Sequence, residues 1–577
     1  MSTIPAARTV PGTAGAASAR SAQTYFRALV LAALGVAIVL PIALILARSV
    51  TPAGTFDFAA PFRALGERSL NRIFLNSIVL GFLVVIGAAV AAVPLALVVT
   101  RTSMRRHAWI DVVLIVPFMT PPYINAMGWI IFMQPRGYLM QLLPGIPDPS
   151  GVFFSLFGMV TIMSFNLFPF LYLMLKNALV QVSGSLDEAA AVHGARRWYR
   201  FRRVTVRLLV SSFAMGALLV FVKTLSEFGT PITMGRRIGF NVLTSEIYRY
   251  TSSWPLDFSR AATFSTLLLS ACLIAWYAQS VIANRNSFHL VAGKGSREAV
   301  LRRGSWLTVV GWAFFGVLLT LSIGVPYFSI FATSLLKIRG RGLALGNFTW
   351  EHYRAIISPG SPGMAALRWS LILSVIAAAV AAVIGTVCAL AVQSGLKRSE
   401  GRAQPVRKAI DFIALLPNTV PSIVVIVGLI LMWNSRAMPI RAYNTPAMLV
   451  IAYVVLFLPF TVQYVKSSYG RIHPNVIAAG RVCGAGPAYT FRRITLPLIL
   501  PGIFAGWTMT FAISFRELVG SLIIRPPSVH TTATFIYAQF EQGSVPQGMA
   551  MAAISVGLTT AIVVLVQRFT SVKRGPG

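Results

Sequence analysis

The clearest shortage in this sequence is charge. Only 11% of its 577 residues are charged, and only 15 of them are acidic. A soluble chain of this length carries about a quarter charged residues and divides into several domains. Here the hydrophobic content is 56% and the mean hydropathy is +0.73. Runs of about 20 apolar residues cross a bilayer as helices, because lipid cannot satisfy backbone polar groups. The composition therefore predicts an all-α polytopic membrane protein.

Residues suited to metal binding, disulfides and catalysis are also scarce. The three cysteines, Cys272, Cys388 and Cys483, are an odd number without metal-ligand spacing, and the first two lie inside apolar runs. Six histidines and 15 acidic residues form no cluster that would mark an active site. We therefore expect no catalytic residues, no metal site, no cofactor and no enzyme activity in this chain.

A nucleotide-binding loop is also missing from the sequence. A P-loop requires Gly, four residues and then Gly-Lys-Ser/Thr. The nearest string, Gly293-Lys294-Gly295-Ser296, lacks the leading Gly and has no Ser or Thr directly after Lys294. Any ATP hydrolysis linked to this chain is therefore expected in a separate subunit.

Basic residues are abundant but confined to short segments. The formal net charge is +35, from 50 basic and 15 acidic residues. Basic loops between apolar runs are typical of the cytoplasmic side of membrane proteins, where they also meet anionic lipid. This distribution argues against nucleic-acid binding and predicts that both termini are cytoplasmic. The basic residues after even-numbered runs include Arg101, Arg105, Arg106, Arg196, Arg197, Arg200, Arg285, Lys294, Lys397, Arg398, Arg481 and Arg492.

Twelve apolar runs are long enough to be membrane spans. They group into two halves of six, with a polar segment at each end and one between the halves. We predict a disordered cytoplasmic tail over residues 1–27, a first transmembrane domain over 28–284, a cytoplasmic linker over 285–304, a second transmembrane domain over 305–570 and a short tail over 571–577. The runs are Ala28–Ala47, Ile78–Thr100, Val112–Met133, Val152–Leu175, Leu208–Glu227, Ala261–Ala283, Trp306–Leu335, Ser370–Ser394, Phe412–Trp433, Ala447–Val465, Leu496–Glu517 and Met549–Val566.

The two halves contain the same short sequence motifs. Phe201-Arg-Arg-Val-Thr recurs as Phe491-Arg-Arg-Ile-Thr, an offset of 290 residues that also relates Gly194 to Gly484. Pro117 and Pro121 recur as Pro417 and Pro421 with an offset of 300. Because the matched positions occupy the same topological slots, the halves are predicted to be parallel six-helix repeats about an axis along the membrane normal.

The loop after the fourth span carries the most specific motif. In the first half it contains Glu188-Ala189-Ala190, then Gly194-Ala195 and Phe201. In the second half it contains Ala478-Ala479-Gly480, then Gly484-Ala485, Phe491 and Leu496-Pro497. An Ala-rich stretch favours helix, and a Gly can end that helix with a positive φ. The pattern predicts a helix, a sharp turn and a second amphipathic segment.

This loop resembles the Glu-Ala-Ala loop of binding-protein-dependent ABC importer permeases, and the whole chain resembles their fused type. The resemblance implies a type I importer fold, two copies of a cytoplasmic ABC ATPase that dock on the loops, and a periplasmic solute-binding protein. It carries a coupling role to Glu188, Ala189, Gly194, Phe201, Ala479, Gly484, Phe491 and Pro497. The second loop departs from the pattern with Ala478 in place of Glu, and the first with Arg207 in place of Pro. Those departures leave open whether the two loops contribute equally.

The fifth span of each half ends at a carboxylate, Glu227 or Glu517. Carboxylates in or near a span usually face a cavity or a partner, so these two are candidates to line the solute pathway. The alternative is a structural ion pair, since Lys223 lies four residues before Glu227 and Arg516 directly precedes Glu517. The residues leave both interpretations open.

The sequences around Glu227 and Glu517 look most like those of the ferric-iron permeases of the same family. This resemblance implies an inner-membrane iron importer. Arg525-Pro-Pro and Thr534-Phe-Ile-Tyr add to that likeness. Related permeases carry thiamine, phosphonate, sulfate or polyamines, and these cargoes stay open. An ion-coupled secondary transporter would share the spans and the repeat, but it would be expected to have buried titratable groups at mid-span and would not need matched loops.

Overall fold

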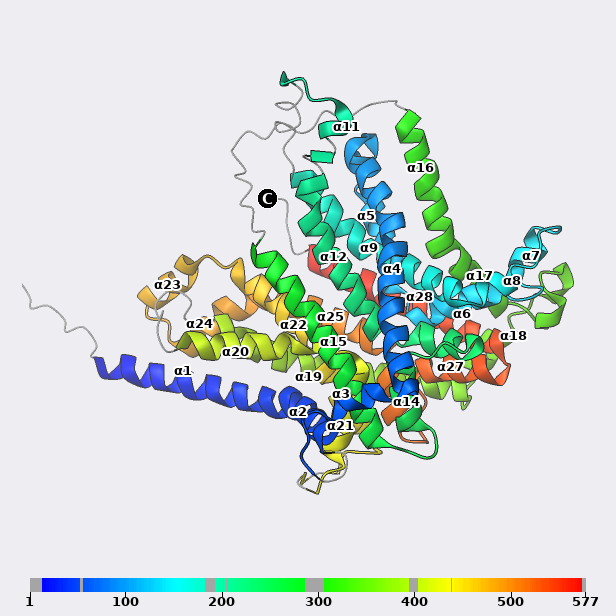
Figure 1. The fold of residues 1–577 in the computed structure, drawn as a ribbon. Coiled ribbons are helices and arrows are strands. Elements are labelled where there is room, and N and C mark those ends of the chain that lie inside the picture. The colour runs from blue at the N-terminus through cyan, green and yellow to red at the C-terminus, as the bar shows by residue number, and fades with distance from the viewer. Residues whose placement is uncertain are drawn as a thin grey trace, which may run out of the picture.

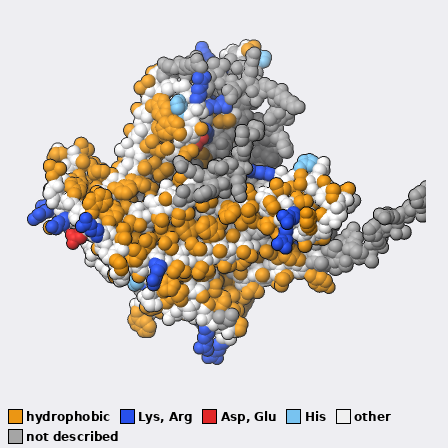
Figure 2. All heavy atoms as spheres, turned by 180° about the vertical axis from the view of Figure 1, so that it is seen from behind, with side chains coloured by type: hydrophobic (Ala, Val, Ile, Leu, Met, Phe, Trp, Pro, Cys, Tyr) orange, Lys and Arg blue, Asp and Glu red, His pale blue; other side chains and the backbone are white. Residues whose placement is uncertain are grey.

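Helices form nearly all of the regular structure. The computed structural model describes residues 13–51, 55–181, 192–200, 202–203, 206–285, 306–393, 403–436, 438–439 and 441–572. Within these ranges no strand forms beyond isolated bridges such as that between Leu336 and Phe348. Figure 1 shows the helix bundle, and Figure 2 shows a broad hydrophobic surface with Lys and Arg side chains near its margins. The predicted all-α polytopic fold is confirmed.

In the first half, helices occupy all six predicted runs in order, and five of these runs form helices long and apolar enough to cross a membrane. Its spans are α1 (Thr13–Leu34) with η1 (Gly35–Val39) and α2 (Leu40–Val50), α4 (Arg68–Arg101), α5 (Trp109–Met119) with α6 (Pro122–Met133), α9 (Leu156–Gln181), α12 (Val206–Ser226) and α15 (Phe258–Arg285). The short elements are α3 (Ala60–Arg63), α7 (Tyr138–Leu142), α8 (Ser150–Phe153), α11 (Arg197–Arg200), η5 (Pro231–Gly235), α13 (Arg236–Ile238) and α14 (Leu243–Ser252).

The second half repeats this order. Its spans are α16 (Trp306–Leu319) with η6 (Thr320–Gly324) and α17 (Val325–Ser334), α19 (Pro362–Gln393), α20 (Ala403–Leu415) with η9 (Leu416–Asn418) and α21 (Ser422–Trp433), α22 (Pro446–Gly470), α25 (Leu496–Ser514) and α28 (Val545–Val572). The short elements are η7 (Arg339–Arg341), α18 (Glu351–Ile357), α23 (Pro474–Val482), α24 (Pro487–Thr490), η10 (Phe491–Thr495), α26 (Val519–Ile524) and α27 (Thr532–Gln542).

The third span of each half is broken at a proline. Ten helices in the described ranges are long and apolar enough to cross a membrane, and a pair bent by 108°, before and after Pro421, raises the number to eleven. Pro121 and Pro421 have nearly the same extended backbone, with φ of −55° and −54°. Proline lacks an N–H and disfavours helix at the residue before it. The continuous helices predicted over Val112–Met133 and Phe412–Trp433 are therefore wrong, although both segments hold their predicted places.

The N-terminal segment also differs from its prediction. Helix α1 begins at Thr13, within the segment 1–27 that the sequence predicts to be disordered. Arg27 is 5% exposed, and its Nε donates a hydrogen bond to the carbonyl oxygen of Ala391 at 3.1 Å. The start of α1 is rich in alanine, which favours helix, and contact with the second half buries a face that an isolated tail would leave exposed.

The first helix of each half lies against the other half. Helix α1 contacts α19 and α20, and α2 packs between α15 and α21. Correspondingly, α16 contacts α4, and α17 packs between α6 and α28. A Cβ atom on Gly128 would lie 2.7 Å from the Cα of Pro326, and one on Gly428 would lie 2.5 Å from the carbonyl oxygen of Pro41. Both crossings therefore depend on a glycine that lets a proline of the exchanged helix approach.

An ion pair joins the third and fourth spans in each half. Lys176 pairs with Asp111, which also accepts a hydrogen bond from the Tyr172 hydroxyl at 3.0 Å. Lys466 pairs with Asp411 in the second half. Both pairs lie at the end of the bundle from which the fourth span enters the motif loop. They fix the position of the helix that leads into each loop.

After its fifth span, each half folds back through short helices before the sixth. The N–H of Leu243, the first residue of α14, donates to the Ser77 hydroxyl at 2.8 Å. The N–H of Thr532, the first residue of α27, donates to the Ser370 hydroxyl at 2.8 Å. Each serine lies in the second span of its half, and each donor would otherwise be one of the unsatisfied N–H groups of a helix start.

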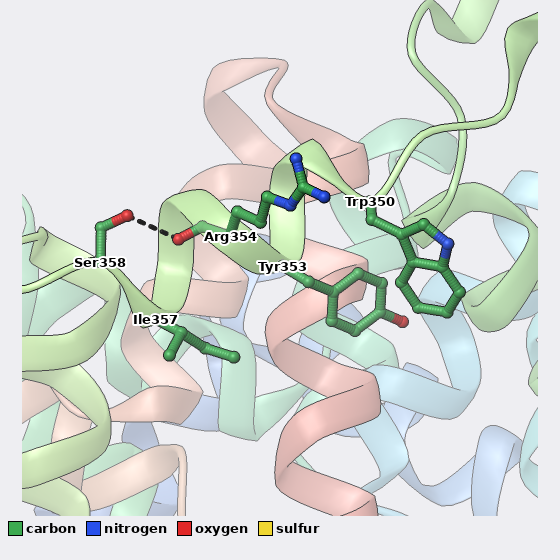
Figure 3. Close-up of a pocket in the computed structure, with 5 residues that line it drawn as sticks. All are labelled: Trp350, Tyr353, Arg354, Ile357 and Ser358. Carbon is green, nitrogen blue, oxygen red and sulfur yellow. Dashed lines mark hydrogen bonds between the residues drawn. The ribbon is translucent and has the colours of Figure 1, made fainter.

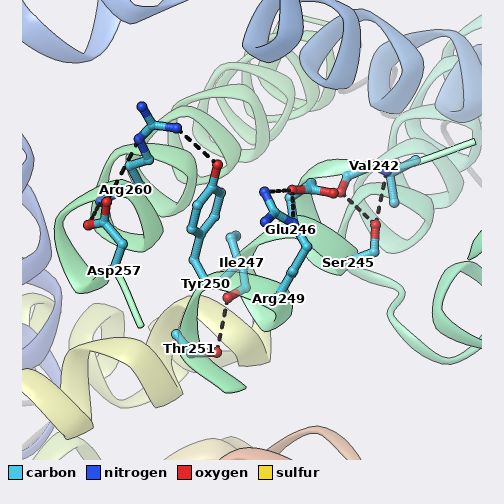
Figure 4. Close-up of polar contacts among 9 residues, drawn as sticks. All are labelled: Val242, Ser245, Glu246, Ile247, Arg249, Tyr250, Thr251, Asp257 and Arg260. Atoms are coloured by element: carbon cyan, nitrogen blue, oxygen red, sulfur yellow. Dashed lines mark hydrogen bonds and ion pairs between the residues drawn. The ribbon is translucent and has the colours of Figure 1, made fainter. Parts of the chain in front are cut away.

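Helix α14 is also held by charged groups. Arg249 donates to the buried Glu246 carboxylate at 2.7 Å and stacks on the Tyr250 ring, with 4.2 Å between the guanidinium carbon and the ring centre (Figure 4). Arg260 donates to the Tyr250 hydroxyl at 3.2 Å and faces Asp257. The carboxylates of Glu246 and Asp257 are therefore both engaged by arginines of the same segment.

A shallow depression lies beside α18. Its lining residues, which all belong to this helix and its two ends, are Trp350, Tyr353, Arg354, Ile357 and Ser358 (Figure 3). Ser358 donates to the backbone carbonyl of Arg354 at 2.7 Å. Because ligand pockets are enclosed and draw on several elements, we regard this depression as surface relief.

Candidate functional site

The second motif loop forms a helix, a glycine turn and a second helix. Helix α23 contains Ala479, which is exposed, and ends just before Gly484, whose φ is +81°. The N–H of Cys483 donates to the Ala479 carbonyl and that of Ala485 to the Gly480 carbonyl, both at 3.0 Å. Such backbone bonds close a helix at a left-handed residue, a conformation that glycine adopts without steric cost.

The first motif loop has the same turn. Gly194 has a φ of +77°, and α11 follows it. Among the described residues, no atom would meet a Cβ at Gly194 or Gly484 within 4 Å, so the backbone conformation is the reason for glycine there. The other candidates of this loop, Glu188, Ala189 and Phe201, lie outside the described residues. The sequence pattern thus anticipates the turn in both loops.

The remaining candidates of the second loop lie where the turn rejoins the membrane span. Phe491 begins η10 and is half-buried. Pro497 is the second residue of α25, directly after the π-helical turn η10, and is exposed.

Each loop also presents two exposed apolar side chains that the motif does not include. Val192 is 86% exposed and Val482 88%, while Tyr199 is 57% exposed and Tyr489 60%. Each pair is related by the same 290-residue offset as the glycines, since 482 − 192 = 290 and 489 − 199 = 290. These four residues thus repeat between the two loops in both position and exposure. The 290-residue offset between the halves is the sequence feature from which these four residues could have been predicted.

Figure 1 shows how the two loops are carried. Helices α9 and α12 rise toward α11, whereas α22 runs toward α23 at the left of the view. The helices that flank the two loops therefore diverge, and the two loops lie on separate arms.

Both candidate pathway carboxylates accept backbone hydrogen bonds. The Glu227 carboxylate accepts from the N–H of Thr230 at 3.0 and 3.2 Å. The Glu517 carboxylate accepts from Gly520 at 3.1 and 2.9 Å and from Ser521 at 3.2 Å. Within the described ranges neither carboxylate lies within 4.0 Å of a basic side-chain nitrogen. Both carboxylates therefore cap the backbone after the fifth span, and the alternative ion pairs with Lys223 and Arg516 do not form.

Arg516 follows α25, at the end of the fifth span of the second half. Tyr327 lies in α17. The Tyr327 hydroxyl lies 2.8 Å from the Thr120 hydroxyl, at the break of the third span. No hydrogen bond or ion pair of the Arg516 guanidinium is formed with the described residues. Sequence reasoning named Arg516 only as a partner for Glu517.

A group of arginines lies at the end opposite the motif loops, and we call it the basic mouth: Arg236, Arg237, Arg339 and Arg525. Arg237 stacks on the Phe540 ring at 5.5 Å, and Arg339 hydrogen-bonds Gln134, so both contacts cross between halves. Burial and the neighbouring Arg237 lower the pKa of the Arg339 guanidinium. Burial and Arg525 likewise lower the pKa of the His530 imidazole. The basic mouth therefore has a positive potential.

Metal-binding clusters do not appear in the described part of the chain. No three His, Cys, Asp or Glu side chains there are grouped so that they could hold a metal ion. The carboxylates of Glu227 and Glu517 are both held by backbone N–H groups.

Comparison with known proteins agrees with the architecture. Residues 84–286 and 395–572 match the family described as the binding-protein-dependent transport system inner membrane component. The chain belongs to this family. One copy of the family domain lies in each half, so the chain is a fused two-domain permease and a multi-pass inner-membrane protein.

Curated relatives add detail on the fused arrangement. The chain is 25% identical over 516 residues to a ferric transport system permease protein of Actinobacillus pleuropneumoniae, covering 88% of this chain and 72% of the relative. It is 24% identical over 470 residues to an Fe(3+)-transport system permease protein of Haemophilus influenzae, covering 80% and 83%. A spermidine/putrescine transport system permease protein of Haemophilus influenzae is 26% identical over 246 residues, covering 43% of this permease and 91% of the relative. The match to the ferric permeases runs through both halves.

Proposed function

We propose that this permease is the membrane subunit of an ATP-driven importer whose cargo is ferric iron. A periplasmic binding protein delivers the cargo at the basic mouth, and two copies of a cytoplasmic ABC ATPase dock on the motif loops. Both termini are then cytoplasmic. Ferric iron is supported by the relatives that match over most of the chain. Thiamine, phosphonate, sulfate and polyamines are the alternative cargoes.

The single observation that carries the coupling role is the pairing of the two loops. Each has a left-handed glycine between an exposed valine and an exposed tyrosine, in the same register. A loop that served only to connect two spans would not need matched apolar exposure. Two loops on diverging arms suit two identical partners, because each partner can bring one arm toward the other when it closes (Figure 1).

The alternative of an ion-coupled secondary transporter makes no use of these loops. It would require a titratable group in the pathway whose protonation or ion binding changes during transport. The carboxylates of Glu227 and Glu517 are instead held by backbone N–H groups. An importer driven by an external ATPase accounts for both findings.

The test is transport by the complete importer in proteoliposomes, with ATPase and loaded binding protein present. The Gly194→Val/Gly484→Val double variant should lower both iron uptake and permease-stimulated ATP hydrolysis at least about tenfold, since valine is strained at positive φ and deforms the docking surface. Gly360→Val is the matched control. Gly360 has a φ of +79° and open surroundings but lies between α18 and α19, at the opposite end.

Uptake by Gly360→Val should stay within about twofold of the unmodified importer. Full uptake by the double variant would refute the coupling role. Iron uptake that persists without the ATPase, and that follows a proton or sodium gradient, would favour the secondary transporter.

A further inference from the structure

Two connections at the end opposite the motif loops are longer than their counterparts in the other half. Between α6 and α9 lie 22 residues, because 155 − 133 = 22, whereas 12 lie between α21 and α22, because 445 − 433 = 12. Between α17 and α19 lie 27 residues, because 361 − 334 = 27, whereas 17 lie between α2 and α4, because 67 − 50 = 17. Each half therefore has one extended connection, at a different place in the order of its spans.

The two long connections, residues 134–155 and 335–361, contact each other, and together we call them the platform. The side-chain oxygen of Gln141 accepts the N–H of Leu343 at 2.9 Å, so a short helix of the first half binds a loop of the second. A Cβ atom on Gly342 would overlap the same oxygen, and this close approach therefore depends on a glycine.

Two further hydrogen bonds tie the platform across the halves. Arg339 donates to the side-chain oxygen of Gln134. The hydroxyl oxygens of Tyr138 and Thr333 lie 2.6 Å apart, at the start of α7 and near the end of α17. Figure 1 shows α7 and α8 at the right margin of the bundle, away from α11 and α23. Because a pseudo-two-fold axis relates the halves, the shorter counterparts lie on its other side, and the platform is one-sided.

The platform is ordered by its own hydrogen bonds. The Asn347 carboxamide donates to the carbonyl oxygens of Ile338 and Gly342 at 2.7 and 2.8 Å, and it accepts the Ile338 N–H at 2.9 Å. Leu336 and Phe348 pair beside it as an antiparallel bridge. Asn347 is buried, so water does not compete for these bonds. A surface that is already ordered loses little conformational entropy when a partner binds.

Exposed apolar and basic groups are found on the platform. Leu345 is 95% exposed, and Leu142 and Leu143 of the first half are 48% and 50% exposed. Asp148 is engaged at the start of α8, where its carboxylate accepts the N–H of Ser150 at 2.9 Å. Basic groups outnumber acidic ones, so a partner surface with acidic and apolar groups would complement the platform. The basic residues are Arg136, Lys337, Arg339, Arg341 and Arg354, and the acidic residues are Asp148 and Glu351.

The partner for such a surface follows from the family, which is one of binding-protein-dependent transport systems. In the proposed importer that protein arrives at the end opposite the motif loops, where the platform adjoins the basic mouth and shares Arg339 with it. Periplasmic binding proteins close two lobes around their solute by a hinge motion. A two-lobed partner could dock on a pseudo-two-fold receptor in either of two orientations. Contacts on one side only favour one of them, because specificity is the difference between two binding free energies.

We propose that the platform binds one lobe of the periplasmic binding protein, through acidic and apolar groups of that lobe, and thereby fixes which lobe meets which half. This inference rests on the proposed function, which it deepens by assigning a docking surface and an orientation to one partner. The opposite side of the permease, with its shorter connections, then receives the other lobe.

Binding to the full-length permease in phosphatidylcholine nanodiscs tests the surface. The probe is the binding protein that stimulates ATP hydrolysis by the complete importer, whatever cargo it carries. Leu345→Glu/Arg341→Glu should weaken its affinity at least about tenfold, because charge is reversed and an exposed apolar contact is lost. The control is Phe58→Glu/Arg72→Glu, which makes the same change of charge at exposed positions near the opposite, shorter connection and should stay within about twofold. Both double variants should keep the melting temperature of the unmodified permease, since the substituted side chains are exposed.

Photo-cross-linking measures the orientation itself. A photoreactive amino acid in place of Leu345 should cross-link to one lobe of the binding protein, and one in place of Phe58 should not reach that lobe. Mass spectrometry of the cross-linked peptides identifies the lobe. When Leu345→Glu/Arg341→Glu is combined with the photoreactive group at the Phe58 position, cross-links should spread to both lobes, because the preferred orientation is lost.

Equal loss of affinity in the two double variants, or equal cross-linking of both lobes from the Leu345 position, would overturn the proposal. So would normal binding by Leu345→Glu/Arg341→Glu with a lowered melting temperature only in nanodiscs that contain phosphatidylglycerol, since the platform would then contact lipid. If the importer moves no iron but binding still depends on the platform, the ferric assignment fails and the docking surface stands. If iron uptake needs the binding protein but both double variants bind it alike, the importer assignment stands and the platform has no docking role.

Discussion

In the first half of the permease, Asp111 pairs with Lys176, and in the second half Asp411 pairs with Lys466. The serine that caps the folded-back helix and the glutamate that follows the fifth span are duplicated in the same way. The interface between the halves is different, because Arg516 stands where the 290-residue offset places Ser226. Several contacts that hold helices together are thus duplicated, whereas position 516 carries a charge that its counterpart, Ser226, lacks.

The largest expected effect concerns the two glycine–proline crossings. Gly128→Ala and Gly428→Ala should each lower the free energy of unfolding by about 2–3 kcal/mol, because the added Cβ would overlap the backbone of Pro326 or Pro41. Thermal unfolding of the purified permease in detergent measures this. Gly316→Ala in α16 meets open space and should leave stability unchanged. A large effect in only one half would show that the crossings are not equivalent.

A smaller effect is expected at the ion pairs. Asp411→Asn should cost about 1 kcal/mol, since the pair is partly exposed. Asp111→Asn should cost more, about 1–2 kcal/mol, because the Tyr172 hydroxyl also donates to this carboxylate. Chemical unfolding of both variants gives the comparison. The Asp411→Lys/Lys466→Asp exchange should recover part of the loss, and equal costs in the two halves would contradict the role assigned to Tyr172.

The helix-capping serines should show a local effect. Ser77→Ala and Ser370→Ala each leave a buried N–H without its acceptor, at a cost of about 1 kcal/mol. Hydrogen exchange should therefore accelerate about fivefold at the start of α14 or α27 respectively. Exchange in the helix of the other half should not change. Acceleration in both helices from one substitution would mean that the halves open together.

The smallest effect on stability is expected at the exposed valines. Val192→Asp and Val482→Asp should change the free energy of unfolding by less than about 0.5 kcal/mol, since both side chains are exposed. Each should nevertheless lower stimulation of the ATPase, because a charge replaces an apolar contact. Comparing the two single variants measures whether the loops contribute equally. Normal stimulation by both would remove these valines from the docking surface.

Much of the architecture was predictable from the sequence, because long apolar runs and an internal repeat can both be recognised in a single sequence. The order of the spans and the glycine turns at Gly194 and Gly484 followed from these signals. The breaks at Pro121 and Pro421 did not, since the residues on both sides are equally apolar and a run of suitable length conceals a bend.

The charged residues show where local rules stop. The alternative pair of Lys223 and Glu227 assumes that the helix continues through both positions, but α12 ends at Ser226. Glu227 therefore turns to the backbone of the following segment. The Glu517 carboxylate likewise accepts from backbone N–H groups and does not pair with Arg516, which adjacency in the sequence does not reveal. The motif loops were thus easier to predict from the sequence than the partners of the charged residues.

The exchange of first helices has a consequence for the order of synthesis. Helices α1 and α2 leave the ribosome long before α20 and α21, whose surfaces they contact, because the rest of the first half lies between them in the chain. Until those helices are made, the face of the first span that will contact α20 and α21 remains exposed to lipid. Joining the halves in one chain keeps that face and its late-arriving partner at a high effective concentration, so assembly does not depend on an encounter between separate subunits.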